Sequence, residues 1–339
     1  MKELLDSFSR KVEYDYDLQN KHLYKKKAGK AKEYYQLAFD ENLDEDLKVL
    51  HKMYKNDMPF RIYGLHTNLY ITSNGYDGLF IDVDIKNSKI KFKRETEEFI
   101  VTSNLTVSAL VNYTKEMGYD FSPLTGIPGV VGGGVVGNSS YPSVIDKDYS
   151  KHFSDFVKKI VVYDFEIGNF IELIPDDNFF GIRDSFLKQA NKIKTKYFVK
   201  EIVLKADYIG KEKVNRFYNA QIEHRKEALK IDYAEGNAGS FFANRHIRNY
   251  VGKAMKGLLL ENPSININVN GATFSPDGNM QFRTESNTTD RDVAKFFRHV
   301  TNKVKEIYDF DLCKYKEVNI LDRDGEIDLN TFIDRNFCK

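Results

Sequence analysis

Two kinds of spacing between hydrophobic and polar positions divide the chain into segments. From residue 60 to 83 the apolar residues fall in short runs, FRIY, LYIT and GYDGLFIDV, which predict strands. The pair Asn74-Gly75 between the last two runs predicts a turn. Later runs, KKIVVYDF, NFIELI and TKYFVKEIVLKAD, predict further strands between residues 158 and 207.

Three other segments space their apolar residues as helices do. Residues 104–118 are expected to form a helix with Asn104 as its N-cap and Gly118 as its stop. A helix of mixed charge is expected from residue 210 to 230. From Thr289 to Ile307 a helix is expected because apolar residues recur every three or four positions, at Val293, Phe296, Phe297, Val300, Val304 and Ile307.

The two ends of the chain are polar. The first 55 residues are charged and rich in tyrosine, and a helix is expected in them because Leu37, Leu43, Leu47 and Leu50 have helical spacing. Residues 142–156 have the composition of a polar insertion, and residues 322–339 that of a polar tail.

Composition and charge narrow the class of protein. A chain of 339 residues suggests two or three domains, and 41% hydrophobic with 30% charged residues is typical of a globular protein. Lys and Arg number 51 and Asp and Glu 50, so the net charge of +1 argues against nucleic acid as a main partner. Because no run reaches the roughly 20 apolar residues of a membrane span and the N-terminus does not read as a signal peptide, we expect a cytoplasmic protein.

The chain has no pattern typical of a metal site. Its two cysteines, Cys313 and Cys338, form no CxxC cluster, and its seven histidines form no HExxH pair. We therefore expect neither a bound metal nor a disulfide framework.

The densest group of glycines lies between Gly126 and Asn138, in the stretch GIPGVVGGGVVGN, which holds six of the chain's 21 glycines in 13 residues. Bare backbone N–H groups in such a stretch can cradle phosphate or pyrophosphate. The spacing matches neither a Rossmann fingerprint nor a Walker loop. A glycine-rich packing turn between strands explains the composition about equally well.

This stretch resembles the second flavin-binding loop of the MurB-type UDP-N-acetylenolpyruvoylglucosamine reductases, in which GIPGTVGGA leads into NAGAYG. Four further segments resemble segments of the same family in the same order. They are IYGLHTNLYITSNGYDGLFI, similar to the first flavin loop, GIRDSFLK, similar to FxYRDSxFK, NAGSFFANR, similar to AGSFFKNP, and KEV, similar to the family's closing Glu-Val. The resemblance covers roughly residues 59–321.

The resemblance implies an α+β fold. It predicts an FAD-binding fold of the PCMH/MurB type, with two α+β subdomains around the flavin, and a C-terminal α+β substrate domain. The implied boundaries are 1–55 for an N-terminal helical and charged segment, 56–98 and 99–210 for the two FAD-binding subdomains, 211–321 for the substrate-binding domain, and 322–339 for the tail.

The resemblance also implies a reaction. In this family NADPH reduces FAD, and the flavin passes hydride to the enolpyruvyl ether of a UDP-N-acetylglucosamine derivative, giving UDP-N-acetylmuramate for peptidoglycan, the cell-wall polymer that maintains cell shape. Matching positions assign Arg183 and Glu317 to holding and polarising the substrate carboxylate, and Ser240 to donating the proton. Asn244 and Arg225 match further substrate contacts, and the expected partner is this UDP-sugar alone, bound by a monomer.

Eleven residues are implied for FAD binding by the two loops. They are Gly64, His66, Thr67, Asn68, Gly126, Ile127, Pro128, Gly129, Gly132, Gly133 and Asn138.

Departures from the family keep two alternatives open. Leu65 and His66 replace glycines of the first loop, Ala243 replaces a lysine, and Ile182 replaces a tyrosine. The chain could therefore be an FAD-dependent oxidoreductase acting on another nucleotide sugar or a hydroxy acid, or a non-catalytic scaffold of the same fold. The presence of all three residues that the chemistry needs argues against the scaffold.

Overall fold

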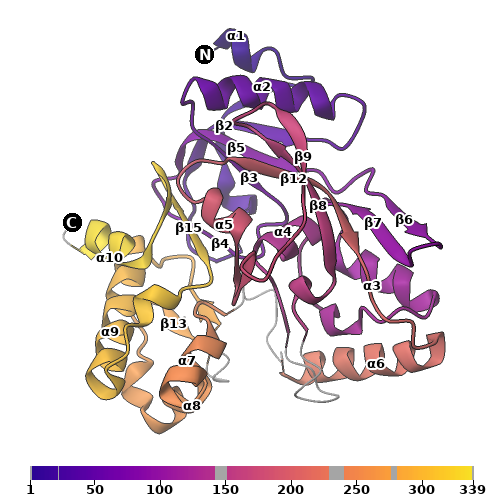
Figure 1. Ribbon diagram of the computed structural model, residues 1–339. Helices are drawn as coiled ribbons and strands as arrows, with labels where there is room; N and C mark the ends of the chain where they lie inside the picture. Colours follow the sequence, from indigo (N-terminus) through magenta and orange to yellow (C-terminus); the bar gives the residue numbers. More distant parts are fainter. Residues whose placement is uncertain (1, 22, 142–150, 229–239, 276–280, 338–339) are drawn as a thin grey trace. The chain divides into compact units, whose positions relative to one another are not determined.

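The structure is a computed structural model that describes residues 2–21, 23–141, 151–228, 240–275 and 281–337. The chain forms two compact units, each discontinuous in sequence. Unit 1 comprises residues 1–13, 34–65 and 80–230, and unit 2 comprises residues 14–33, 66–79 and 231–339. Both mix strands and helices (Figure 1).

Unit 1 is built on a five-stranded antiparallel sheet of order β6-β7-β12-β8-β9 (Figure 1). Its central strands are rich in Val, Ile and aromatic residues, which favour the pleated conformation. Their inward side chains, such as Val101 and Ile202, are fully buried with Leu110 and Val135 of two covering helices. The strands are β6 (Ile90–Lys93), β7 (Glu98–Thr102), β8 (Val157–Asp164), β9 (Asn169–Leu173) and β12 (Tyr197–Leu204).

The helices of unit 1 are short apart from α2 and α6. They are α1 (Lys2–Leu5), α2 (Leu43–Lys55), α3 (Val107–Glu116), α4 (Val131–Val136), α5 (Phe186–Ala190) and α6 (Lys211–Ala228). Two short strands, β10 (Phe180–Gly181) and β11 (Asp184–Ser185), form a hairpin just before α5. The predicted strands at 158–165, 169–174 and 195–207 and the predicted helix at 210–230 are confirmed within the described residues.

The N-cap predicted for α3 is wrong by two residues. Thr106 caps the helix, since its hydroxyl accepts a hydrogen bond from the N–H of Ala109 at 3.2 Å. The side chain of Asn104 instead donates to the carbonyls of Asp84 and Lys86, at 2.9 Å each. The predicted stop is confirmed, because Gly118 follows the C-cap with a φ of +85°.

Unit 2 packs helices and two small sheets around an aromatic core. One sheet has the order β16-β15-β4, in which β4 runs parallel to β15, and the other is the hairpin of β13 and β14. The core contains Phe241, Phe242, Phe274, Phe282, Phe296 and Phe297, each at most 1% exposed. The elements are β4 (Leu69–Ile71), α7 (Asn244–Val251), α8 (Met255–Glu261), β13 (Thr273–Phe274), β14 (Phe282–Arg283), α9 (Asp290–Tyr308), β15 (Asn319–Asp322), β16 (Gly325–Ile327) and α10 (Leu329–Phe337).

Boundaries between the units fall within three strands, β1 (Glu13–Asp17), β2 (Lys30–Leu37) and β5 (Tyr76–Val83). They belong to a four-stranded sheet of order β1-β2-β5-β3, with β3 at Phe60–Tyr63. The turn predicted at Asn74-Gly75 is confirmed: Gly75 has a φ of +72°, and a Cβ there would lie 2.0 Å from the carbonyl oxygen of Lys30.

Two predictions about the chain ends are wrong. The first 55 residues contain strands β1 and β2 as well as helix α2, and Leu37 ends β2 instead of starting a helix. Residues 322–337 are not a polar tail, because they form the end of β15, β16 and α10. Leu329, Phe332 and Ile333 of α10 are buried in the core of unit 2. The boundaries expected at residues 98, 210 and 321 remain predictions.

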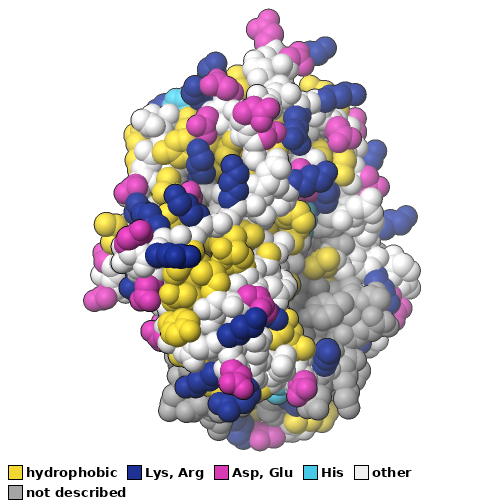
Figure 2. Space-filling model, turned by 90° about the vertical axis from the view of Figure 1, so that its right-hand side faces the viewer, with side chains coloured by type: hydrophobic (Ala, Val, Ile, Leu, Met, Phe, Trp, Pro, Cys, Tyr) yellow, Lys and Arg dark blue, Asp and Glu magenta, His cyan; other side chains and the backbone are white. Residues whose placement is uncertain are grey.

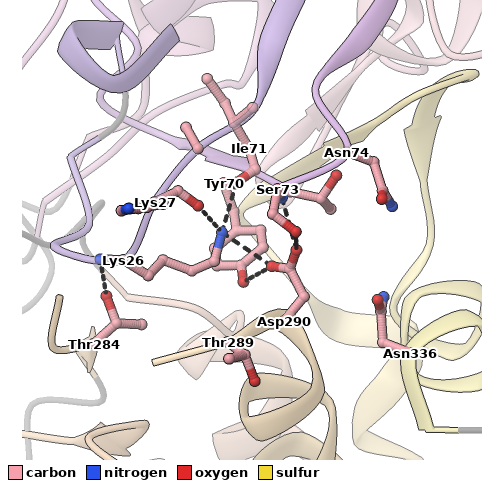
Figure 3. Close-up of polar contacts among 12 residues, drawn as sticks. Lys26, Lys27, Tyr70, Ile71, Ser73, Asn74, Thr284, Thr289, Asp290 and Asn336 are labelled. Atoms are coloured by element: carbon pink, nitrogen blue, oxygen red, sulfur yellow. Dashed lines mark hydrogen bonds and ion pairs between the residues drawn. The ribbon is translucent and has the colours of Figure 1, made fainter. Parts of the chain in front are cut away.

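A buried ion pair ties the first segment of unit 2 to helix α9 (Figure 3). The Nζ of Lys26 lies 3.0 Å from Oδ1 of Asp290, and both side chains are at most 5% exposed. Asp290 also accepts hydrogen bonds from the hydroxyls of Tyr70 and Ser73, at 2.7 and 2.5 Å. Lys26 donates further to the carbonyls of Lys27 and Ile71. Both charged groups therefore have hydrogen-bond partners inside the unit.

The surface carries mixed charge. On the face drawn in Figure 2, basic and acidic side chains are interspersed, in keeping with the net charge of +1. Among the described residues, none of the helices has the length and apolar character needed to cross a membrane.

Candidate functional site

The glycine-rich stretch of unit 1 forms a turn followed by the short helix α4. Gly126 and Gly129 have φ values of +74° and +109°, which glycine adopts without strain. Gly132 and Gly134 allow close packing: a Cβ on Gly132 would lie 2.7 Å from the Cβ of Ser103, and one on Gly134 would lie 2.4 Å from the ring of Phe153. The packing-turn interpretation therefore accounts for part of the glycine content.

Gly133 has no such packing role. It is exposed, and a Cβ placed on it would have no neighbour nearer than 3.9 Å. The N–H groups of Gly133 and Val130 make no hydrogen bond to any described residue, whereas those of Val131 and Gly132 donate to the carbonyls of Leu105 and Ser103. This side of the stretch thus has bare backbone and free N–H donors, which suit an anionic group such as the pyrophosphate of FAD.

The GIRDSFLK segment lies against the end of this stretch. Asn138 donates its Nδ2 to the carbonyl of Gly181 at 2.8 Å, and the hydroxyl of Ser185 donates to the carbonyl of Val136 at 2.6 Å. Asn138 itself has a φ of +40°. Unit 1 therefore brings together two of the motifs on which the resemblance rested.

Arg183 occupies a strained turn between β10 and β11. The two strands are joined by Ile182 and Arg183 alone, and Arg183 has a φ of +57°. Glycine is the usual residue at such a position, because a Cβ crowds the backbone there. Lys188 fixes the turn by donating to the carbonyl of Arg183 at 2.9 Å, and Asp184 accepts from the N–H of Ser185 and from Gln189.

Arg225, near the end of α6, packs on the beginning of the glycine-rich stretch. Its Nη1 donates to the carbonyl of Thr125 at 3.3 Å, and its guanidinium lies 4.0 Å from the ring centre of Tyr141. A Cβ on Gly126 would lie 2.3 Å from its Cδ, so Gly126 is needed for this contact. Ile127 is buried in the core of unit 1, and Pro128 is exposed.

The first flavin loop keeps a glycine-like backbone despite its substitutions. Gly64 belongs to unit 1, where a Cβ would lie 2.6 Å from the side chain of Val130. His66 and Thr67 are half-buried residues of unit 2, and His66 has a φ of +56°, the left-handed conformation that a glycine favours. The conformation of the family's loop is thus compatible with this histidine.

Unit 2 brings Ser240, Glu317 and Asn68 to adjacent backbone segments. The N–H of Glu317 donates to the carbonyl of Phe241 at 2.8 Å, so Glu317 lies opposite the residue next to Ser240. Asn68 donates its Nδ2 to the carbonyl of Glu317 at 2.9 Å. Three segments that are far apart in the sequence thus meet in one place.

Other predicted contacts of unit 2 lie close to Ser240 in the sequence. Asn244 is the first residue of α7, and its Oδ1 accepts from the N–H of Met255 at 3.3 Å. Ala243, which replaces the family's lysine, is 4% exposed and serves as the N-cap residue of α7. Sequence reasoning missed Gln281, which lies directly opposite Ser240. The one signal in the sequence was the placement of Gln281 and Arg283 on either side of an apolar Phe282.

The described residues contain no group of three or more His, Cys, Asp or Glu side chains that could hold a metal ion. They do fit FAD, because the bare backbone at Gly133, the free N–H groups beside it and the glycine-like turn at His66 are features that a bound dinucleotide uses.

Comparisons with known proteins agree with this geometry. Residues 37–160 match the family model described as an FAD binding domain. The UDP-N-acetylenolpyruvoylglucosamine reductase of Petrotoga mobilis is 30% identical over 83% of this chain and 87% of its own length. The enzyme of the same name from Thermotoga petrophila is 29% identical over 76% of this chain and 82% of its own. The crystal structure of the reductase MurB from Thermus caldophilus, 20% identical, superposes with a TM-score of 0.64 and covers 91% of this chain and 98% of that one, which shows the shared fold.

Proposed function

Since the chain belongs to the family of UDP-N-acetylenolpyruvoylglucosamine reductases, we propose that Arg183, Ser240 and Glu317 carry the charge and proton chemistry of that reaction. The protein is an FAD-dependent oxidoreductase that uses NADPH. It converts UDP-N-acetylglucosamine enolpyruvate to UDP-N-acetylmuramate, a precursor of peptidoglycan. The observation that carries this function is the match to the Petrotoga mobilis reductase over most of both chains.

FAD would be held by the glycine-rich stretch, where the N–H groups of Val130 and Gly133 have no partner among the described residues, and by the loop at Gly64, His66, Thr67 and Asn68. When bound, it supplies the hydride, taken from NADPH, that is added to the CH2 carbon of the enolpyruvyl ether. The protein must then manage the charge that this addition leaves behind.

Arg183 is proposed to bind the substrate carboxylate. Hydride addition leaves negative charge on the neighbouring carbon and on this carboxylate, and a guanidinium can neutralise it through two parallel hydrogen bonds. The φ of +57° at Arg183 supports the assignment, because backbone strain is often retained where function requires one orientation. Asn244 and Arg225 are proposed as further contacts of the sugar nucleotide.

Ser240 is proposed to give the proton that completes the reaction at the adjacent carbon. A serine is a weak acid, so it can serve only if its hydroxyl is already in place. The support is local: Phe241 and Phe242, the next two residues, are buried in the aromatic core and hold the backbone of Ser240. We assign Glu317 to the substrate carboxylate, where its own carboxyl must be protonated or paired with a cation, because two carboxylates repel each other.

The change Ser240→Ala tests this assignment. NADPH should still bleach the flavin at the wild-type rate, because that step needs no proton from Ser240. Turnover of the enolpyruvyl sugar nucleotide should fall by about 10²- to 10⁴-fold, the usual effect of losing a general acid. Ser286→Ala, at an exposed position of the same unit, is the matched control and should change neither rate. Undiminished turnover in Ser240→Ala would remove Ser240 from this role.

We also propose that the enzyme acts in the cytoplasm, because NADPH and UDP-sugars are small molecules of that compartment.

We further propose that it acts as a monomer. Light scattering after gel filtration, at micromolar concentration and with FAD bound, would measure the mass of the particle. A mass of twice the 39.3 kDa chain would contradict the monomer.

A further inference from the structure

A row of polar residues crosses the hairpin of β13 and β14 next to Ser240. Gln281 directly precedes β14 and lies opposite Ser240 in an antiparallel bridge. On its other side, the carbonyl of Gln281 accepts from the N–H of Ser275 at 2.9 Å. Because opposite residues of antiparallel segments share a face, the side chains of Ser275, Gln281 and Ser240 lie side by side on one face.

The other face of the hairpin belongs to the aromatic core. Phe274 and Phe282 lie opposite each other in the two strands and are at most 1% exposed. Successive residues of a strand point to opposite faces, so Arg283, like Gln281, points away from that core and toward the face of Ser240. Arg283 lies two residues beyond Gln281, opposite Thr273.

These polar groups are buried without hydrogen-bond partners in the described part of the chain. Gln281 is 7% exposed, and its Oε1 has no partner. The same holds for the Oγ of Ser275, at 1% exposure, and for the Nε of Arg283. Buried polar atoms are paired in the great majority of cases, so three unpaired groups on one face beside a reactive serine indicate that a ligand supplies their partners.

We propose that Gln281 and Arg283 bind the UDP-sugar beside Ser240, an inference that rests on the proposed role of that serine. The guanidinium of Arg283 binds an anionic oxygen of the substrate, either of its diphosphate or of its enolpyruvyl carboxylate. The amide of Gln281 offers both a donor and an acceptor, and it holds the sugar-enolpyruvyl region against Ser240. Both are substrate-binding residues and exchange no proton.

Calorimetric titration of the FAD-loaded, oxidised enzyme tests the role of Arg283. In Arg283→Met the Kd of the enolpyruvyl sugar nucleotide should rise by about tenfold or more, as expected for a lost charge-assisted hydrogen bond. Arg291→Met removes the same charge from an exposed position on α9 and should leave the Kd unchanged. If UDP alone also binds more weakly, Arg283 contacts the diphosphate, and if only the enolpyruvyl compound does, it contacts the carboxylate. Unchanged affinity for both ligands would overturn the inference.

The change Gln281→Leu separates ligand binding from a structural role. Leucine has a similar size and removes an unpaired buried amide, so the Tm of the ligand-free holoenzyme should stay the same or rise. The KM for the sugar nucleotide should rise several-fold, while the rate of flavin reduction by NADPH stays unchanged. A lowered Tm with an unchanged KM would show that Gln281 is structural and would contradict the proposal.

The two proposals fail in different ways. If the wild-type enzyme does not turn over the enolpyruvyl sugar nucleotide, the roles assigned to Arg183, Ser240 and Glu317 fail. The UDP titrations of wild type, Arg283→Met and Arg291→Met still decide whether the binding pair exists, because they need no turnover, and a wild type that binds neither UDP nor the enolpyruvyl compound would exclude it.

Discussion

Arg183 combines local strain with a proposed function at a single residue. It sits at the second position of a two-residue turn, with a φ of +57°, where a side chain costs about 1–2 kcal/mol relative to glycine. A sequence selected for stability alone would carry glycine or asparagine there. The cationic side chain must therefore contribute something that offsets the strain.

A pair of changes at this position separates strain from function. The free energy of unfolding, measured in urea, should be about 1 kcal/mol higher for Arg183→Gly than for Arg183→Ala, because only glycine relieves the backbone strain. Both changes should lower kcat/KM for the enolpyruvyl substrate by similarly large factors, since both remove the guanidinium. Retained turnover in the glycine variant would mean that Arg183 does not bind the carboxylate.

Helix α4 contains glycines with two different roles, and adjacent substitutions distinguish them. At Gly133 an added methyl group meets open space and improves helix propensity, so Gly133→Ala should stabilise the FAD-free protein by about 0.5–1 kcal/mol. The same methyl group should weaken FAD binding if the cofactor approaches the backbone there. At Gly134 a Cβ would lie 2.4 Å from the ring of Phe153, so Gly134→Ala should destabilise the protein with or without FAD. Thermal unfolding and FAD titration measure both effects, and equal FAD affinity in wild type and Gly133→Ala would exclude Gly133 from the cofactor site.

The stability that the first turn of α9 contributes depends on pH, because this turn contains the buried carboxyl of Asp290. Burial alone would raise the pKa of this carboxyl, but the positive charge of Lys26 and the hydrogen bonds from Ser73 and Tyr70 outweigh burial and hold the pKa below 3.8. Its stabilising effect is therefore fully present above about pH 4 and is lost as the pH falls through the lower pKa of the folded state.

Asp290→Asn tests this dependence. At pH 7 the change should cost about 3–5 kcal/mol, because it leaves the buried Lys26 without its counter-ion. The difference from wild type in the free energy of unfolding, measured in urea, should become smaller as the pH is lowered from 5 to 3. Glu285→Gln, at an exposed position, should show little difference at any pH. If the difference in free energy of unfolding between wild type and Asp290→Asn becomes larger at lower pH, the assigned ion pair is contradicted.

At the scale of the whole molecule, the two half-reactions can be followed by colour. The purified protein should be yellow or become so with FAD, NADPH should bleach it under anaerobic conditions, and the enolpyruvyl sugar nucleotide should restore the colour. Bleaching without recovery would leave the flavin chemistry intact and contradict the assigned substrate. The measurement is a visible absorption spectrum at each step.

The sequence was sufficient for the family and for the α+β flavin-binding fold, and both predictions are confirmed. Each motif is a short contiguous string, and the resemblance rests on several of them occurring in the same order at compatible spacing. The contacts between motifs could not be predicted. Asn68 and Glu317 are 249 positions apart, and no local sequence pattern predicts their hydrogen bond. The roles of the site residues stay predictions.

The misread segments have physical explanations. Leu37 shared a helical spacing with Leu43 and Leu47, but it ends a strand whose tyrosines are buried as well. In α10, three apolar residues at helical spacing were enough to join the core, although polar and charged residues dominate residues 322–339 as a whole. The left-handed backbone at His66 could not be predicted, because residues other than glycine adopt it in only a few per cent of cases.

The pairing of Lys26 with helix α9 has a consequence for biosynthesis. The backbone of Lys26 bonds to Thr284, which is 258 positions later in the chain. A ribosome adding 5–20 residues per second needs roughly 13–50 s to make that stretch, and throughout this time Lys26 and strand β4 lack the partners that residues 284–321 provide. Unit 2 can therefore close only after nearly the whole polypeptide has been synthesised, and a nascent chain stalled before residue 284 would expose these segments to chaperones and proteases.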